Sequence, residues 1–319
     1  EYHITVSIGI DLFPEEDQDS TDILKRADTA MYRAKHAGRN TICFFEPEMQ
    51  ISADRRLTLE KDLRHAVAQD ELYLVYQPMI DWQGNVIGAE VLLRWQHSKM
   101  GSIQPSDFIP IAEDTGMIFE ISEWILNNVC QQLRSWKDAG LTDHLKTVAV
   151  NLSPKQFSQP GFEDTVLEIV NRHGVDPACI EFEITEGLII SNLKNTVVRM
   201  QGMREHGFHF SVDDFGTGYS SLAYLKQLPI NRLKIDRSFV SDITEGSNDA
   251  TIVETIISMA HHLGLEVVAE GVENRMQHYF LMQHSCDIYQ GHYFSKPLLP
   301  DEFVQLEITQ SKQLTVIQE

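Results

Sequence analysis

Two adjacent carboxylates, Asp213 and Asp214, mark the stretch of this 319-residue chain whose residue types most clearly suggest chemistry. They follow a β-branched and aromatic run, Phe208 to Val212, which predicts a strand, and a loop with two glycines comes after them. Side chains alternate between the two faces of a strand, but at its end both acids can converge on a cation. The pattern favours a metal site, although the same residues could form a solvated turn in which one aspartate caps the next helix.

Other polar residues recur at the ends of strand-like runs along the chain. They are Glu90, Asn151, Glu183, Lys234, Glu270 and Gln290. If these runs are strands of one barrel, the residues meet on a single rim. Carboxylates gathered there ionise poorly unless divalent cations neutralise them, and oxygen-only ligands favour Mg²⁺ or Mn²⁺ over zinc.

The elements that must position these residues predict an α/β chain with a TIM-like (β/α)8 barrel. Eight strand-like runs alternate with amphipathic helices over roughly 250 residues. The runs are 72–80, 86–95, 147–152, 179–185, 208–212, 232–235, 265–269 and 288–294, and the clearest helices are 121–139, 162–173, 193–205 and 250–263. Only residues 81–85 separate the first two runs, so we expect that pair to be antiparallel, unlike the strands of a regular barrel.

The residues before the barrel predict a smaller unit and a connector. Residues 1–45 give a strand from His3 to Ile10, an acidic loop, and an amphipathic helix from about Thr21 to Ala37. Residues 46–56 predict a connector, 57–307 the barrel domain, which opens with a helix ending near Gln69, and 308–319 a tail. A strand so close to the first residue indicates a fragment of a longer protein.

Composition limits the classes of partner. The net charge is −21 and the pI is near 4.9, which argues against a general nucleic-acid-binding surface, because phosphate backbones need a basic footprint. A small anionic ligand is compatible if bound cations reverse the local field. The four cysteines form no CxxC pair and are expected to be reduced. Without a signal peptide or a long apolar run, the fragment is expected to be cytoplasmic, without membrane contact, although the parent protein could be membrane-anchored upstream.

Seven motifs, in order, resemble the EAL domain family of cyclic di-GMP phosphodiesterases. They are Glu90-Val91-Leu92-Leu93-Arg94-Trp95, Asn151-Leu152-Ser153, Glu183-Ile184-Thr185-Glu186, Asp213-Asp214-Phe215-Gly216-Thr217-Gly218, Leu233-Lys234-Ile235-Asp236, Ala269-Glu270-Gly271-Val272-Glu273 and Gln290-Gly291. The resemblance covers about residues 57–307 and implies the same distorted barrel, with hydrolysis of cyclic di-GMP to linear pGpG.

The residues from Val6 to Asn40 resemble the C-terminal end of a GGDEF (diguanylate cyclase) domain. The GG(D/E)EF signature itself does not occur in this sequence, so we expect this fragment not to synthesise a cyclic dinucleotide. The resemblance also implies that upstream sensory and GGDEF regions of the same protein regulate the barrel.

The EAL resemblance implies a site with two divalent cations. The residues that would hold the first cation are Glu90, Asn151, Glu183 and Asp213. Asp213 would bridge to a second cation, which Asp214 helps to bind. Lys234 would orient the attacking water or stabilise charge on the phosphate, and Glu270 would be a general base or a ligand of the second cation.

The resemblance also implies contacts to the substrate. Arg94 would hold a phosphate oxygen through its guanidinium group. The other expected nucleotide contacts are Gln77, Leu93 and Gln290. Glu186 would anchor the loop from Phe215 to Ser221, which in the family links the metal site to a dimer interface, so a homodimer is expected.

Several residues have a second interpretation or depart from the family pattern. Lys234 could instead pair with Asp236, Asn151 could cap a helix, and Glu273 is about equally a site residue or a helix N-terminal carboxylate. The signature reads Glu-Val-Leu instead of Glu-Ala-Leu, with Val91 expected to point away from the metal, and His292 replaces a tyrosine common in the family. The alternatives to an enzyme are a receptor that binds cyclic di-GMP without cleaving it, or a structural, partner-binding domain.

Overall fold

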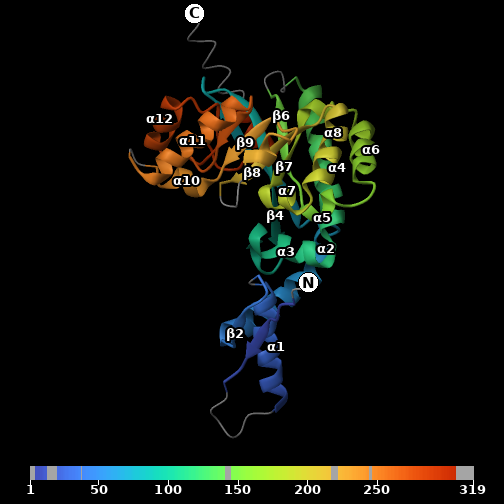
Figure 1. Cartoon of the computed structure of the whole chain (residues 1–319). Helices are drawn as coiled ribbons and strands as arrows, with labels where there is room; N and C mark the ends of the chain where they lie inside the picture. The colour runs from blue at the N-terminus through green and yellow to red at the C-terminus, as the bar shows by residue number, and fades with distance from the viewer. Residues whose placement is uncertain are drawn as a thin grey trace, which may run out of the picture.

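A computed structural model describes residues 4–12, 20–36, 38–140, 145–216, 222–243 and 246–306. Figure 1 shows a barrel surrounded by helices and a small N-terminal unit that projects away from it. The strands of the main sheet are β3 (Leu72–Asp81), β4 (Val86–His97), β5 (Gly101–Ile103), β6 (Thr147–Asn151), β7 (Ile180–Thr185), β8 (His209–Phe215), β9 (Arg232–Ile235), β10 (Glu266–Ala269) and β11 (Ile288–Tyr289).

The main sheet closes on itself. Its order is β3-β11-β10-β9-β8-β7-β6-β4-β5, and an additional β3–β4 pairing closes eight of the strands into a barrel, leaving β5 outside on the end of β4. Strand β3 is antiparallel to both β4 and β11, and the other barrel pairings are parallel. The predicted barrel with one antiparallel strand is therefore confirmed.

The last strand is shorter than the predicted 288–294. The backbone turns at Gly291, where an added Cβ atom would lie 2.1 Å from the carbonyl oxygen of Val272. A glycine at this position therefore allows the chain to turn close to another backbone segment, and Tyr293 N–H bonds to Val272 O after the turn. This close approach gives a physical reason for glycine in the Gln-Gly motif.

The predicted barrel helices are present as α4 (Ile118–Asp138), α6 (Phe162–His173), α8 (Leu193–Glu205) and α11 (Asn248–His262). Helices that were not predicted are α3 (Pro105–Thr115), α5 (Pro154–Phe157), α7 (Glu186–Ser191), α9 (Leu222–Leu225), α10 (Arg237–Ser241) and α12 (Arg275–Gln283). No helix among the described residues has both the length and the apolar composition that a membrane span needs.

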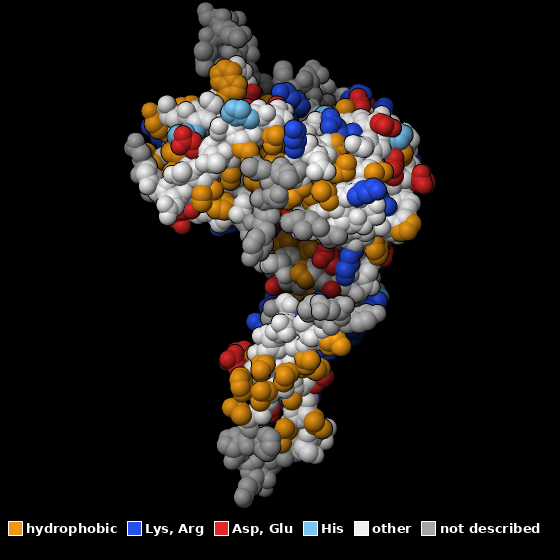
Figure 2. All heavy atoms as spheres, viewed as in Figure 1, with side chains coloured by type: hydrophobic (Ala, Val, Ile, Leu, Met, Phe, Trp, Pro, Cys, Tyr) orange, Lys and Arg blue, Asp and Glu red, His pale blue; other side chains and the backbone are white. Residues whose placement is uncertain are grey.

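The N-terminal unit contains β1 (Ile8–Ile10), α1 (Ser20–His36) and β2 (Ile42–Phe44). The two strands are parallel, and α1 lies so close to β1 that a Cβ atom on Gly9 would be 2.0 Å from the carbonyl oxygen of Ala27. The strand is shorter than predicted, since residues 4–7 are not paired, and β2 was not predicted. Apolar side chains remain exposed over this unit, including Val6, Leu24, Ile42 and Phe44 (Figure 2).

Helix α2 (Pro47–Ala66) joins the N-terminal unit to the barrel as one continuous element. It contains the predicted connector, 46–56, and most of the helix predicted to end near Gln69. No glycine interrupts it and its only proline is in the first turn, where a missing N–H costs nothing. Arg55 and Arg56 of α2 form ion pairs with Asp107 and Asp114 of α3 at 2.9 and 2.8 Å.

The barrel interior has an apolar middle layer and a charged group at the end where the parallel strands begin. The middle layer consists of Met79, Ile87, Ala149, Val268 and Ile288, while the larger hydrophobic core lies outside, between strands and helices.

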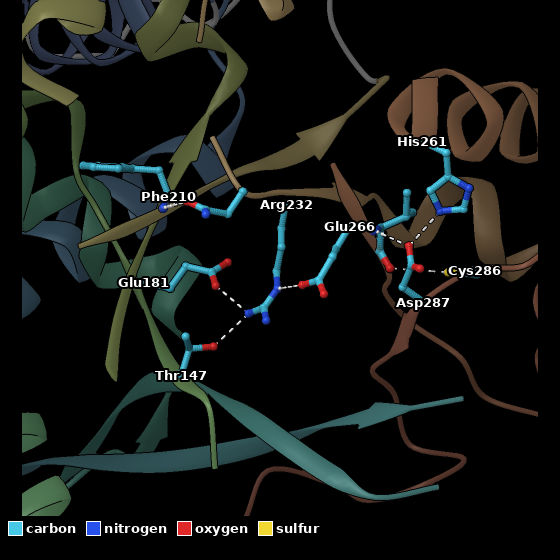
Figure 3. A network of polar contacts seen from close by, with 10 residues as sticks. Thr147, Glu181, Phe210, Arg232, His261, Glu266, Cys286 and Asp287 are labelled. Carbon is cyan, nitrogen blue, oxygen red and sulfur yellow. Dashed lines mark hydrogen bonds and ion pairs between the residues drawn. The ribbon is translucent and has the colours of Figure 1, made fainter. Parts of the chain in front are cut away.

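The centre of this charged group is Arg232, which is 5% exposed and bonds to Glu181 at 2.5 Å, Thr147 at 2.7 Å and Glu266 at 2.9 Å (Figure 3). This network closes the end of the barrel where the parallel strands begin.

Candidate active site

The opposite end of the barrel gathers four carboxylates around the buried ammonium of Lys234. Lys234 is 1% exposed. The distances from its Nζ atom are 2.5 Å to Glu270, 2.9 Å to Glu183, 3.1 Å to Asp213 and 3.5 Å to Glu90. These ion pairs bring together five residues from different strands, as the sequence predicted, and Asp236 is not among them.

Strand alternation explains how this cluster forms. On β7, Phe182 and Ile184 belong to the core outside the barrel, so Glu183 between them points inward. On β9, Leu233 and Ile235 likewise direct Lys234 inward. Because the parallel strands are in register, their carboxyl ends meet at one rim.

A backbone irregularity brings Asp214 to the same place as Asp213. The pairing of β8 with β9 shifts between Val212 and Phe215, and Asp214 has a positive φ of 53°. Asp214 therefore leaves the simple alternation, at a backbone conformation that aspartate tolerates better than most residues. Ligand oxygens of Asp213, Asp214 and Glu270 lie within 4.8 Å of one another.

The buried oxygens of this cluster lack hydrogen bonds. Both carboxylate oxygens of Glu183, Oδ1 of Asp213 and Oε1 of Glu270 are buried without a hydrogen-bond partner, although Lys234 Nζ lies within ion-pair distance of these three carboxylates. Including Asp214, five carboxylates face one ammonium, an excess of four negative charges if all are ionised. Buried carboxylates of this kind are the donor set that hard divalent cations require.

The protonation of the cluster reflects the same crowding. Burial raises the pKa of Glu183 well above its usual range, and the neighbouring carboxylates add to the rise while Lys234 opposes it. Burial also raises the pKa of Glu270 to about 8, against the lowering effect of Lys234. Partial burial and the charge of Asp213 raise the pKa of Asp214 to about 6.

Lys234 itself stays protonated. Burial alone would lower its pKa, but the surrounding carboxylates raise it well above its usual range. Lys234 therefore supplies a positive charge to the cluster, while the raised pKa values of Glu183 and Glu270 favour their protonated forms unless further cations are bound.

A hydrogen-bonded group of amides extends the cluster on the β3–β4 side. Asn151 Nδ2 donates to Glu90 Oε1 at 2.8 Å, and Gln290 Nε2 donates to Glu90 Oε2 at 2.6 Å and to Gln77 Oε1 at 3.2 Å. Glu90 itself is buried, whereas the oxygen of the Gln290 amide is buried without a partner. Gln77, Asn151 and Gln290 thus lie beside Glu90, with Asn151 at the exposed edge.

Arg94 and Leu93 lie further along β4, on its opposite faces. The Arg94 guanidinium is half-buried and donates to the Leu93 carbonyl at 2.9 Å, leaving other N–H groups for an anion. Leu93 lies in the hydrophobic core with Val91, so its side chain points away from the face that carries Glu90. The expected substrate contacts of Arg94 and Leu93 stay predictions.

Two further predicted residues lie outside the carboxylate cluster. Glu186 is buried and accepts a hydrogen bond from the Tyr224 hydroxyl at 2.5 Å, but the loop that it was expected to anchor falls largely outside the described residues. Tyr224 was not anticipated, because one tyrosine after a glycine-rich loop has no distinctive spacing. Glu273 is exposed, and among the described residues no hydrogen bond or ion pair joins its side chain to the cluster.

Comparison with known proteins identifies the family. A family model described as EAL domain matches residues 60–297, more than half of the chain. The chain belongs to the EAL domain family. A second model, described as diguanylate cyclase, GGDEF domain, matches residues 1–41 ahead of the EAL domain.

Two relatives of this chain are larger proteins of Pseudomonas aeruginosa. The chain is 42% identical over 305 residues to the bifunctional diguanylate cyclase/cyclic di-GMP phosphodiesterase MucR, covering 95% of this chain and 44% of MucR. It is 40% identical over 296 residues to the cyclic di-GMP phosphodiesterase NbdA, covering 92% of this chain and 38% of NbdA. The chain thus spans less than half the length of these two relatives.

A solved structure shares the fold of this EAL domain. The PaMucR phosphodiesterase in a c-di-GMP complex matches with a TM-score of 0.74 and 40% identity, covering 77% of this chain and 99% of that one. The barrel and its antiparallel strand are therefore those of the EAL family.

Proposed function

We propose that this EAL domain hydrolyses cyclic di-GMP to linear pGpG with the help of two divalent cations. The observation that carries the proposal is the convergence of four carboxylates on Lys234, those of Glu90, Glu183, Asp213 and Glu270, of which all but Glu90 have buried oxygens without hydrogen-bond partners. The names of MucR and NbdA, and the cyclic di-GMP bound by the similar MucR domain, support the choice of substrate.

The proposed cation ligands follow from the donor set. The first cation, Mg²⁺ or Mn²⁺, would be held by Glu90, Asn151, Glu183 and Asp213. The second would share Asp213 and be held by Asp214, with Glu270 within reach. When bound, the pair lowers the pKa of a water molecule and stabilises negative charge on the phosphate.

Side chains of this domain would bind the substrate and accept the proton of the attacking water. Arg94 has guanidinium N–H groups for a non-bridging phosphate oxygen. Glu270 would accept a proton from the attacking water if it is not taken up as a ligand, and the ammonium of Lys234 would stabilise charge beside it. The amides of Gln77 and Gln290 and the residue Leu93 would contact the nucleotide.

The decisive test is product formation by this chain. We expect cyclic di-GMP to be converted to pGpG in the presence of Mg²⁺ or Mn²⁺, and the conversion to be lost in Glu90→Ala and Asp213→Ala, measured by chromatography with mass spectrometry. Glu168→Ala, on the exposed face of α6, is the matched control and should retain activity. Binding of cyclic di-GMP by the wild type without cleavage would instead indicate a receptor.

The location, oligomeric state and regulation of the domain are proposed from its resemblance to the EAL family. We place the domain in the cytoplasm, as a homodimer regulated by upstream sensory and GGDEF regions of the same protein. Light scattering coupled to size-exclusion chromatography measures the oligomeric state directly, and a monomer at micromolar concentration would contradict the homodimer.

A further inference from the structure

The segment after β6 is hydrogen-bonded to the last turn of helix α3. Ser153 Oγ donates to Glu113 Oε1 at 2.7 Å, and Lys155 Nζ donates to the Glu113 backbone carbonyl at 2.8 Å. Ser153 lies two residues after Asn151, the last residue of β6. Glu113 therefore contacts the short stretch of chain that carries a proposed cation ligand.

Asn151 needs a defined orientation to act as a ligand. Its Nδ2 donates to Glu90 Oε1 at 2.8 Å, so its Oδ1 atom is the one left to approach a cation. A rotated amide would present N–H groups to the cation, which cannot bind it. The orientation of this amide is therefore as important as its presence.

The backbone that follows Asn151 is held on two sides, and the Leu152 side chain between them is buried in the hydrophobic core. On one side, Leu152 N–H bonds to Glu183 O of the neighbouring strand at 2.9 Å. On the other side lie the two contacts with Glu113. Asn151 itself is exposed, so packing alone does not hold its side chain in place.

Glu113 is well placed to supply this support, because its helix is firmly held. Phe108, Ile111 and Ala112 of α3 are buried, and α3 ends at Gly116 in the left-handed conformation. The next residue, Asp114, pairs with Arg56 of α2 at 2.8 Å and lies 3.5 Å from Lys155. Both Glu113 and Ser153 are half-buried, which shields their hydrogen bond from water.

We propose that Glu113 is a positioning residue that, through Ser153 and Lys155, holds Asn151 so that its Oδ1 atom faces the cation site. This inference rests on the proposed function, in which Asn151 is a cation ligand. Partners that hydrogen-bond directly to a ligand typically change metal affinity by about 10-fold or more when removed. Glu113 acts on the segment that follows Asn151 and not on Asn151 itself, so we expect an effect at the lower end of this range.

The test measures cation affinity and turnover separately. Mn²⁺ binding is followed by electron paramagnetic resonance, and kcat and KM for cyclic di-GMP are determined, for the wild type, Glu113→Ala, Ser153→Ala and the double variant. We expect each single variant to bind Mn²⁺ about 10-fold more weakly and the double variant to be no worse than either, because both remove the same hydrogen bond. The loss should appear in kcat at limiting Mn²⁺ and recede at saturating Mn²⁺.

Two further variants separate positioning from general damage to the fold. Glu113→Gln retains an oxygen that can accept from Ser153 and should restore most of the affinity. Asp107→Ala removes a carboxylate from the same helix that pairs with Arg55 and does not contact the β6–α5 segment, so it should leave Mn²⁺ affinity unchanged. Ser153→Ala keeps the test decisive if Glu113→Ala does not fold.

The outcomes distinguish this inference from the proposed function. Unchanged Mn²⁺ affinity in folded Ser153→Ala overturns the inference, whatever the activity. A wild type that binds Mn²⁺ but does not cleave cyclic di-GMP overturns the proposed function and leaves the positioning role measurable by affinity. A wild type that binds no Mn²⁺ overturns both.

Discussion

Lys234 and Arg232 lie two residues apart on the inward face of β9, yet they neutralise the carboxylates at opposite ends of the barrel. Lys234 pairs with Glu183, and Arg232 pairs with Glu181, which lies two residues before Glu183 on β7. The apolar layer that includes Ala149 and Val268 belongs to the interior between the two groups. The Arg232 guanidinium forms three hydrogen bonds to its neighbours, whereas the carboxylates around Lys234 include buried oxygens without hydrogen-bond partners.

Replacing Lys234 by methionine should both destabilise the metal-free protein and abolish hydrolysis. The substitution leaves four carboxylates close together without their cation, and loss of one partner of a buried ion pair costs about 3–5 kcal/mol. Protonation of the carboxylates will offset part of this cost. Urea unfolding should show the loss of stability without divalent cations and a partial recovery with saturating Mg²⁺; equal stability without metal would refute the expectation.

Arg232→Met should destabilise the fold without weakening cation binding by the molecules that remain folded. Glu181 is 1% exposed and would lose its partner, again a cost of about 3–5 kcal/mol. Adding Glu181→Met should recover much of the stability, because the second change removes the unpaired charge. Chemical denaturation of the single and double variants measures the free energy of unfolding. If the double variant loses as much stability as the two single variants together, Arg232 and Glu181 do not stabilise the fold as a pair.

Glu71 should stabilise the fold more at neutral than at acidic pH. Burial alone would raise its pKa, but hydrogen bonds from the Trp95 indole and the Ser98 backbone prevail and lower the pKa below its usual 4.5. This stabilisation is complete above the unfolded pKa and is lost as the pH falls through the lower folded pKa.

Glu71→Gln tests this pH dependence. It should cost on the order of 1 kcal/mol at pH 7 and progressively less below pH 4.5. Urea unfolding across this range provides the measurement, with Glu60→Gln on the exposed face of α2 as the control. If the stability difference between the wild type and Glu71→Gln grew as the pH fell, the prediction would be wrong.

Glu270 and Glu273 should differ sharply in their effect on turnover, although only three positions separate them. Glu270 contacts Lys234 at 2.5 Å, whereas the side chain of Glu273 is exposed. Glu270→Ala should lower kcat by at least about 100-fold, and Glu273→Ala should change it less than about 2-fold. Steady-state kinetics at saturating Mn²⁺ decides between them, and a large loss in Glu273→Ala would assign that residue to the site.

The barrel and most of the site could be predicted because they depend on local, repeated patterns. Outward residues such as Phe182 and inward residues such as Glu183 alternate along strands, and amphipathic helices such as α6 show their spacing directly. Helix α3 was not predicted, since Pro110 lies inside it and normally signals a break. Strand β5 has three residues, too few for a periodic pattern.

The details of the site depend on tertiary structure that no local pattern encodes. Asp214 lies where the pairing of β8 with β9 shifts, and β9 follows only later in the chain. The position of Glu113 beside Ser153 depends on how α3 docks against the barrel, 40 residues away along the chain.

Helix α2 gives the molecule torsional stiffness between its two parts. Twenty helical residues span about 30 Å and contain no glycine or interior proline at which the axis could bend easily. A twist applied at the N-terminal unit is therefore carried along the helix axis to the ion pairs of Arg55 and Arg56 with α3. A rotation about the helix axis would therefore act on α3, whose Glu113 contacts the segment that follows Asn151.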